Sequence, residues 1–314
     1  MSEKITVLDG GMGRELLKSG APFKQPEWSA LALIEAPEYV EKAHDAFITA
    51  GADVITTNSY AVVPFHIGEE RFADLGLELV DLSGKLARSA AQKTGGRVRV
   101  AGSLPPVFGS YRPDLFDAER APEILSVLVQ GLSPYVDFWL AETQGSLTEV
   151  EAIRRALGDD PRPLWLSFTL DDRNGVRDVI AGKWPPRLRS GETVAEAAAK
   201  AVELGASALL FNCSQAEIME AAIKAARQSL QDSSLHAAIG VYANAFVPRP
   251  ESQEEIKANS GLGDLREDLD PPGYLTFASR WVDAGATIVG GCCGIGPEHI
   301  FEIKTTFKPE PVAA

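Results

Sequence analysis

The chain has 314 residues, 45% of them hydrophobic, and a formal net charge of −14. That size and composition allow a large core and suit an α/β barrel built as one domain. An acidic chain without a basic stripe is a poor binder of nucleic acid or of an anionic membrane surface. No run of residues is long and apolar enough to span a bilayer, and residues 1–8 lack the apolar stretch and cleavage site of a secretion signal.

These features predict a cytoplasmic protein. Thiols stay reduced in the cytosol, so an odd set of three cysteines favours metal binding or catalysis over disulfides. The sequence leaves the oligomeric state open.

Eight short runs have the composition of buried β-strands. They are Ile5–Asp9, Asp53–Asn58, Val98–Leu104, Asp137–Thr143, Leu164–Leu170, Ala208–Cys213, Ala238–Asn244 and Thr287–Cys292. Segments with helical apolar spacing separate most of them, namely Pro37–Ala50, Glu70–Lys93, Ala118–Tyr135, Ser146–Leu157, Thr193–Leu204, Gln215–Ser229 and Tyr274–Ala284, and a last helix starts near Pro297. Strands and helices that alternate eight times predict a parallel sheet closed on itself. The expected fold is a (β/α)8 TIM barrel, as a single domain over residues 1–314.

A doubly wound open sheet is the alternative fold. The turn Asp9-Gly-Gly-Met-Gly13 looks superficially like a dinucleotide-binding loop. It does not match G-x-G-x-x-G, and no acidic residue ends a second strand at the expected distance. Local signals agree with the barrel elements, because Ser146 with Glu149 and Thr193 with Glu196 have the spacing of helix capping boxes.

Polar residues stand where the predicted strands end. They are Asp9, Asn58, Glu142, Cys213, Asn244, Cys292 and Cys293. In a barrel of this kind the chemistry lies where strands end and βα loops begin. Burying such a polar set without a ligand would be costly, so these positions are candidate site residues.

The three cysteines are the strongest of these candidates. A lone cysteine is usually a small buried hydrophobe, but here three stand at strand ends and two are adjacent. Neighbours in an extended strand face opposite ways, so Cys292 and Cys293 can share a metal only if the backbone turns sharply. The flanking Gly290, Gly291 and Gly294 permit that turn. Three thiolates with one open position form a catalytic zinc arrangement, so we expect one zinc ion per chain on Cys213, Cys292 and Cys293.

Two carboxylates are candidates for binding a substrate ammonium group. Asp9 could instead be a turn acceptor ahead of Gly10, and Glu142 could form a salt bridge to a neighbouring arginine. If both face the barrel mouth, they would select amino-acid substrates over plain thiols.

Aromatic residues follow the first three strands: Trp28, Tyr60, Phe108 and Tyr111. Each alone suits packing, but together they could form a cation–π cage for a cationic methyl donor. The four histidines, His44, His66, His236 and His299, show no metal-ligand spacing, so none is assigned as a ligand.

These segments resemble the homocysteine S-methyltransferases. This group includes S-methylmethionine-dependent enzymes, betaine–homocysteine methyltransferase and the homocysteine-binding module of cobalamin-dependent methionine synthase. The matching segments are Asp9-Gly-Gly-Met-Gly-Arg-Glu-Leu16, Trp28-Ser-Ala30, Gly51-Ala-Asp-Val-Ile-Thr-Thr-Asn-Ser-Tyr60, Glu142-Thr143, Leu188-Arg-Ser-Gly-Glu192, Phe211-Asn-Cys213 and Gly290-Gly-Cys-Cys-Gly294, with Pro297 and His299-Ile300. The combination of Asn-Cys with Gly-Gly-Cys-Cys is the most specific of these.

The resemblance implies a (β/α)8 barrel with zinc on the three cysteines. It implies that Asp9 and Glu142 hold the homocysteine amino group. Thr57 and backbone N–H groups of the turn at Asp9, Gly10 and Gly11 would lie near its carboxylate. Trp28 and Tyr60 are the aromatic residues assigned to substrate binding, and Asn212 and Asn244 would support the zinc loops.

The expected reaction is zinc-dependent methyl transfer from an onium donor to the homocysteine thiol, giving methionine. Residues 102–111 depart from the Gly-Pro-Tyr-Gly-type turn of many members, and that loop helps frame the donor pocket. The chain stops near Ala314 without the long extension of the betaine enzymes, which favours a donor like S-methylmethionine. Betaine, S-adenosylmethionine, dimethylsulfoniopropionate and a corrinoid protein stay open, as do seleno-analogues of the acceptor.

Two other functions stay open. One is a metal-free barrel enzyme with Cys213 as a covalent nucleophile, although no cysteine has a plausible histidine partner in its sequence context. The other is a non-catalytic module that binds zinc or thiols.

Overall fold

The computed structural model describes residues 4–231, 237–248 and 263–309. Its eight strands form one parallel sheet in the order β1-β8-β7-β6-β5-β4-β3-β2. They are β1 (Thr6–Val7), β2 (Val54–Thr56), β3 (Arg99–Leu104), β4 (Phe138–Gln144), β5 (Leu164–Phe168), β6 (Ala208–Asn212), β7 (Ala238–Tyr242) and β8 (Ile288–Val289). A parallel bridge between Leu8 and Val54 joins β1 to β2 and closes the ring. The predicted TIM barrel is confirmed, and the open doubly wound sheet is wrong.

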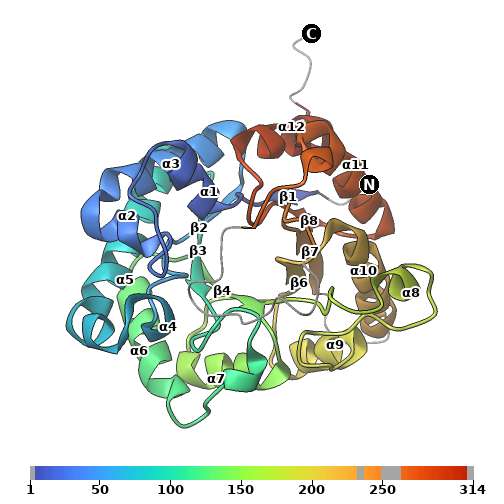
Figure 1. Cartoon of the computed structure of the whole chain (residues 1–314), viewed down its shortest axis with the longest axis horizontal. Coiled ribbons are helices and arrows are strands. Elements are labelled where there is room, and N and C mark those ends of the chain that lie inside the picture. Colours follow the sequence, from blue (N-terminus) through green and yellow to red (C-terminus); the bar gives the residue numbers. More distant parts are fainter. Residues whose placement is uncertain (1–3, 232–236, 249–262, 310–314) are drawn as a thin grey trace.

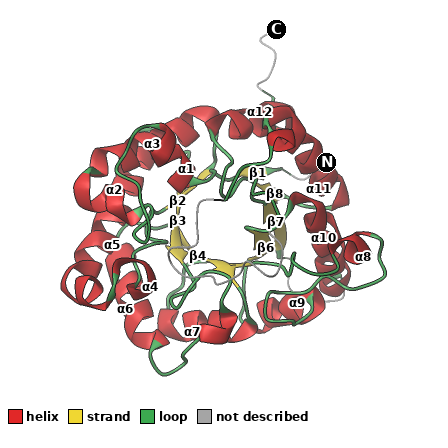
Figure 2. Ribbon diagram, in the orientation of Figure 1, coloured by secondary structure: helices red, strands yellow, loops and turns green. Residues whose placement is uncertain are grey.

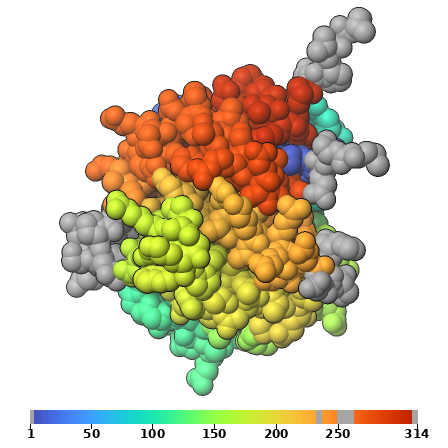
Figure 3. Space-filling model, turned by 90° about the vertical axis from the view of Figure 1, so that its right-hand side faces the viewer, coloured from blue at the N-terminus to red at the C-terminus, as the bar shows by residue number. Residues whose placement is uncertain are grey.

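Helices surround the ring of strands on all sides (Figures 1 and 2). They are α1 (Met12–Lys18), α2 (Ala30–Glu35), α3 (Pro37–Ala50), α4 (Pro64–Ile67), α5 (Glu69–Gln92), α6 (Ala121–Leu132), α7 (Leu147–Leu157), α8 (Val176–Ile180), α9 (Val194–Glu203), α10 (Ala216–Leu230), α11 (Pro271–Ala284) and α12 (Pro297–Phe307). Figure 3 shows one flank of the molecule, where α10 packs between α9 and α11 and also contacts α8. None of the helices in the described residues is long and apolar enough to cross a membrane.

The core has two layers, as a closed barrel requires. Side chains that point inward form one cluster, which includes Phe138, Trp165 and Tyr242. A larger cluster lies between the strands and the surrounding helices and includes the fully buried Trp139 and Trp281. Strands buried on both faces explain why the β runs of the sequence are continuously apolar rather than alternating.

Most strands are shorter than the sequence predicts, and their order is as expected. The predicted first strand ends at Asp9, whereas β1 ends at Val7. The predicted eighth strand ends at Cys292, whereas β8 ends at Val289. The polar residues at these ends lie just beyond the ladder, so their side chains and backbone can turn toward the mouth of the barrel.

Helix ends confirm the local signals. Both predicted capping boxes are present, with Ser146 and Glu149 at the start of α7 and Thr193 and Glu196 at the start of α9. The helix α3 ends at Gly51, whose φ of 104° is a left-handed value that glycine adopts without strain.

Candidate active site

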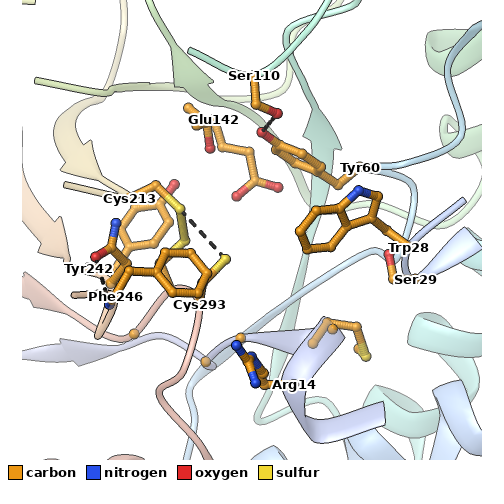
Figure 4. Close-up of a pocket in the computed structure, with 18 of the residues that line it drawn as sticks. Arg14, Trp28, Ser29, Tyr60, Ser110, Glu142, Cys213, Tyr242, Phe246 and Cys293 are labelled. Atoms are coloured by element: carbon orange, nitrogen blue, oxygen red, sulfur yellow. Dashed lines mark hydrogen bonds between the residues drawn. A yellow bond between two sulfur atoms is a disulfide. The ribbon is translucent and has the colours of Figure 1, made fainter. Parts of the chain in front are cut away.

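A cavity of about 340 Å³ opens at the carboxyl ends of the strands. Most of the predicted site residues line it: Asp9, Gly10, Trp28, Thr57, Tyr60, Glu142, Cys213, Asn244, Cys292 and Cys293. Asn58 also lines it, whereas Asn212 lies outside the lining. In Figure 4, Glu142 lies between the cysteine cluster on one side and Trp28 with Tyr60 on the other.

The three cysteines converge, as predicted. Their sulfur atoms all lie within 4.8 Å of one another, and Cys213 Sγ is 3.9 Å from Cys293 Sγ. Four-coordinate zinc with bonds of about 2.3 Å places neighbouring sulfur ligands about 3.8 Å apart. The separation of Cys213 Sγ and Cys293 Sγ matches this spacing, and the cluster could hold a tetrahedral ion with three protein ligands. Among the described residues, it is the one group of His, Cys, Asp or Glu side chains close enough to hold a metal.

A sharp turn brings the adjacent cysteines to one site. Cys292 O accepts a hydrogen bond from Ile295 N at 3.0 Å, and Gly294 adopts a φ of 88°. Gly11 packs against this turn, since a Cβ on it would lie 2.5 Å from Cys292 O. Of the three flanking glycines, Gly294 adopts the left-handed conformation that the prediction requires, and Gly11 adds a close contact between the first and last βα loops.

Cys213 and Cys292 form a disulfide in this structure, and Cys293 is free. The sequence favoured metal binding or catalysis over disulfides, and the pairing of Cys213 with Cys292 contradicts that expectation. Sulfur atoms gathered closely enough to share one metal are also close enough to bond to each other once oxidised. Burial raises the pKa of the Cys293 thiol to about 11, so a cation is needed to hold it as a thiolate at neutral pH.

Asp9 and Glu142 are the acidic walls of the cavity. Asp9 accepts hydrogen bonds from Thr56 N at 2.7 Å and Thr56 Oγ1 at 3.1 Å. Glu142 accepts one from Ser103 Oγ. Asp9 therefore bonds across to the second strand, and the side-chain partner of Glu142 is a serine rather than an arginine.

Both carboxyl groups titrate near neutrality. Burial raises the pKa of Asp9 to about 7, and the charge of Glu142 raises it further against the hydrogen bonds from Thr56. Burial also raises the pKa of Glu142 to about 7. Glu142 is partly exposed to the cavity, yet the surrounding protein excludes enough water to disfavour its charged form. A pair of carboxyls of this kind gains most from a cationic ligand between them.

Fewer backbone amides are free to bind a substrate carboxylate than the sequence predicts. Asp9 N donates to Val54 O at 3.0 Å, and Gly11 N donates to Ile295 O at 2.8 Å. Of the three amides in the turn, the amide of Gly10 is the one left to meet a carboxylate. Thr57 Oγ1 is buried and bonds Ser59 Oγ at 3.0 Å and Ser103 N at 3.0 Å, so it also fixes the segment beside Glu142.

Three of the four predicted aromatic residues line the cavity: Trp28, Tyr60 and Tyr111. Tyr60 Oη shares a hydrogen bond of 2.6 Å with Ser110 Oγ. Phe108 lies outside the lining and packs edge-on against Phe116 at 6.0 Å, so its assignment to a cage is wrong.

Backbone strain is concentrated at this cavity. In the described part of the chain, four non-glycine residues have positive φ: Trp28, Tyr111, Thr143 and Cys213. All four line the cavity. Non-glycine residues in this region are held there by their surroundings, and such strain gathers at functional sites.

Asn212 and Asn244 connect the loops at the ends of the strands. Asn212 bonds the backbone and side chain of Thr143 and so joins the Cys213 loop to the Glu142 loop. Asn244 N donates to Ser214 O at 3.2 Å, and its Oδ1 accepts from Phe246 N at 3.1 Å.

The histidines behave as structural groups. His66 lines the cavity, and its Nδ1 lies 3.2 Å from Pro26 O, while burial lowers its pKa to about 4. His44 is fully buried in α3, and His299 caps the start of α12 through a bond from Gly296 N. His236 lies outside the described residues.

Sequence reasoning assigned no role to the charged groups that complete the lining, which are Arg14, Asp172, Arg173 and Arg189. Arg14 and Arg189 lie inside segments that carry the family resemblance, and this is the one sequence feature that could have identified them. The four residues do not lie at the ends of predicted strands, so no other pattern indicated that they line the cavity.

Known proteins resemble this chain over nearly its whole length. A family model for homocysteine S-methyltransferases matches residues 6–307. The homocysteine S-methyltransferase of Escherichia coli (strain K12) is 29% identical over 332 residues, covering 96% of this chain and 95% of that protein. The selenocysteine methyltransferase of Astragalus bisulcatus is 26% identical and covers 95% of this chain and 90% of its own.

Solved structures similar to this chain include members of the same family. The crystal structure of the homocysteine methyltransferase of Escherichia coli in its metallated form matches with a TM-score of 0.74 and 26% identity, covering 96% of both chains. The oxidised form of the same protein also matches with a TM-score of 0.74, at 25% identity. Because the family model spans nearly the whole chain, the protein belongs to the homocysteine S-methyltransferase family.

Proposed function

We propose that this protein transfers a methyl group from an onium donor, most simply S-methylmethionine, to the thiol of homocysteine, with one zinc ion held by Cys213, Cys292 and Cys293. The observation that carries the proposal is the geometry of the sulfur cluster. Three sulfurs within 4.8 Å of one another share a cavity with two carboxyl groups. A relative solved in a metallated form supports the metal.

The acceptor is inferred from the acidic wall. An ammonium group between Asp9 and Glu142 would relieve the cost of ionising two buried carboxyls. A short amino acid held there by its ammonium would have its thiol within the same cavity as the cysteines. The amide of Gly10 would receive the carboxylate of that amino acid.

Zinc, when bound, lowers the pKa of a thiol that coordinates it, so that the thiolate is available at neutral pH. The chain supplies three thiolates, whose charges leave the site net negative and keep an added sulfur nucleophilic. The reaction needs no general acid, because a sulfonium donor leaves as a neutral sulfide.

The bond changes balance without a further reagent. The acceptor sulfur forms a bond to the methyl carbon while the bond from that carbon to the donor sulfonium breaks. The electron pair goes to the donor sulfur, and the acceptor's thiol proton has already gone to solvent. Homocysteine and S-methylmethionine would thus give two molecules of methionine. Trp28, Tyr60 and Tyr111 would hold the cationic donor, so that most of the protein's contribution is alignment of the two sulfurs with the methyl group.

A donor screen tests the proposal. The reduced, zinc-loaded protein is mixed with homocysteine and either S-methylmethionine, S-adenosylmethionine, betaine or dimethylsulfoniopropionate, and methionine is measured. Methionine formation with a sulfonium donor is the expected result, and no transfer from any donor would contradict it. Selenocysteine belongs in the same screen as a second acceptor, because a selenocysteine methyltransferase is among the relatives.

A further inference from the structure

The wall of the cavity beyond β5 carries a buried arginine. The Arg189 side chain is 6% exposed, and its Nη2 donates to Asp172 Oδ1 at 2.8 Å. The Arg189 guanidinium also stacks over the ring of Tyr111 at 4.9 Å. All three residues line the cavity, so this cluster is part of the site rather than of the outer surface.

The charge of Arg189 is only partly matched. Asp172 divides its acceptor capacity, because Oδ2 receives a hydrogen bond from Gln215 N at 2.8 Å. The Nε of Arg189 is buried and has no hydrogen-bond partner. A buried arginine with an unused donor is costly unless a ligand completes it, and a carboxylate is the ligand that matches the planar fork.

Arg189 lies across the barrel from Gly10, whose amide is the predicted partner of the acceptor's carboxylate. The strand order places β5 directly opposite β1 across the barrel. Asp9 and Gly10 follow β1, whereas Asp172 and Arg189 belong to the connection between β5 and α9. Asp9 and the amide of Gly10 would hold one end of the acceptor at the β1 side, with Glu142 reaching it from β4, the neighbour of β5. Arg189 is then available to another ligand on the side opposite Gly10.

We propose that Arg189, held by Asp172 and Tyr111, binds the carboxylate of the methyl donor. This inference rests on the proposed function and adds to it the class of donor, an onium compound that carries a carboxylate. A guanidinium repels a bare cation, so Arg189 would disfavour simple sulfonium compounds. It would favour zwitterionic donors, whose negative end reaches Arg189 while the onium methyl lies near the sulfurs.

The test pairs a change in the donor with a change in the protein. S-methylmethionine and its carboxamide differ in the carboxylate alone, and each is assayed with saturating homocysteine in the zinc-loaded enzyme. In the unsubstituted protein, we expect the carboxamide to lower kcat/KM for the donor by roughly 10- to 100-fold, the effect of losing one charge-assisted pair. In Arg189→Gln the two donors should differ by less than about threefold, because the partner of the carboxylate is gone.

Two further variants serve as a control and as a conservative substitution. Arg187→Gln is the matched control, because Arg187 is exposed on the same connection and its Nη1 bonds Gly191 O at 2.7 Å outside the cavity lining. It should keep the full discrimination between the donors. Arg189→Lys keeps the charge and loses the fork, so it should show intermediate discrimination even if Arg189→Gln folds poorly.

The outcomes separate this inference from the proposed function. A normal preference for the carboxylate donor in Arg189→Gln and Arg189→Lys would overturn the role of Arg189 while leaving methyl transfer in place. A rise in KM for homocysteine with unchanged donor discrimination would assign Arg189 to the acceptor's carboxylate and also overturn the inference. Absence of transfer by the unsubstituted protein from either donor would overturn the proposed function, and the inference with it.

Discussion

Asn212 and Thr143 are joined by two hydrogen bonds that link β6 to β4, the strands on either side of β5. Asn212 Oδ1 accepts from Thr143 N at 2.9 Å, and Asn212 Nδ2 donates to Thr143 Oγ1 at 2.8 Å. Asn212 precedes Cys213, and Thr143 follows Glu142. Cys213 and Thr143 both have positive φ, at 51° and 58°. One buried side chain therefore holds two strained turns and couples the position of a sulfur to that of a carboxylate.

Replacing Asn212 with Ala should disturb both halves of the site. The buried N–H of Thr143 and the hydroxyl of Ser167 would lose their acceptor, which lowers the free energy of unfolding by about 1–3 kcal/mol. We expect zinc affinity to fall about tenfold, as for partners that orient metal ligands, and KM for homocysteine to rise. Denaturant unfolding, metal competition and steady-state kinetics measure the three effects.

Thr143→Val is the matched control, since it removes the Oγ1 bond and leaves the backbone bond to Asn212. Its effect on all three quantities should be smaller. If Asn212→Ala lost stability but kept normal zinc affinity and normal KM, the coupling between the two turns would be refuted.

The binding of homocysteine should depend on pH near neutrality. The pKa of both Asp9 and Glu142 is raised to about 7, so below that pH the carboxyls are largely protonated and cannot pair with an ammonium group. KM for homocysteine should therefore fall as the pH rises from about 6 to about 8. Glu142→Gln should raise KM and weaken this dependence. Initial rates across this pH range give the profile.

The raised pKa values of Asp9 and Glu142 also predict how the stability of the fold changes with pH. Carboxyls whose pKa is raised on folding hold protons that the unfolded chain releases, so stability falls as the pH rises from about 4.5 to about 7. Glu149 is the control, because burial also raises its pKa to about 7 while its Oε2 caps α7 through Gly145 N and Ser146 N. Glu149→Gln should change stability and leave the pH profile of KM intact. An identical KM profile in Glu142→Gln would argue against an ammonium site.

Trp28 should act on the donor. Its ring lines the cavity, packs edge-on against Phe23 at 5.9 Å, and sits on backbone with a φ of 51°. Loss of a cation–π contact of about 1 kcal/mol predicts that Trp28→Leu raises KM for the donor about fivefold to tenfold, with little change for homocysteine. Trp184→Leu is the control, because Trp184 is 55% exposed and outside the cavity lining. Equal effects of Trp28→Leu on both substrates would assign Trp28 to general packing.

The barrel could be predicted from the sequence because each strand and helix has a local sequence signal. Apolar β runs, capping boxes at Ser146 and Thr193, and glycine at the end of α3 each report a short-range preference. The convergence of Cys213 with Cys292 and Cys293 followed from the rule that strand ends share one face of a barrel. That rule needs only the order of elements, which the sequence carries.

The remaining parts of the site depend on long-range contacts. Arg189 pairs with Asp172 inside one long connection, 17 residues away. Glu142 bonds Ser103 on the neighbouring strand, and Gly11 N donates to Ile295 O at the other end of the chain. No local preference encodes such a pair. The same reason explains Phe108, because Ser110 and Tyr111 of the same loop line the cavity while the ring of Phe108 packs against Phe116.

The thiols should report the state of the cluster. Protein kept without reductant should show one reactive thiol after denaturation, from Cys293, and bind little zinc, because Cys213 and Cys292 are paired. After reduction three thiols should react, and zinc should slow their modification in the folded protein. Quantifying thiols with a chromogenic disulfide reagent, before and after reduction and with and without metal, checks this. Three reactive thiols in unreduced protein would contradict the pairing.

The most direct measurement is the zinc content of the reduced protein set beside its methyl transfer from S-methylmethionine to homocysteine. We predict one zinc ion per chain in active protein, and loss of both the metal and the activity in Cys213→Ser and Cys293→Ser. Full turnover by a preparation stripped of metal, or zinc retained in both serine variants, would contradict a metal centre built from these three sulfurs.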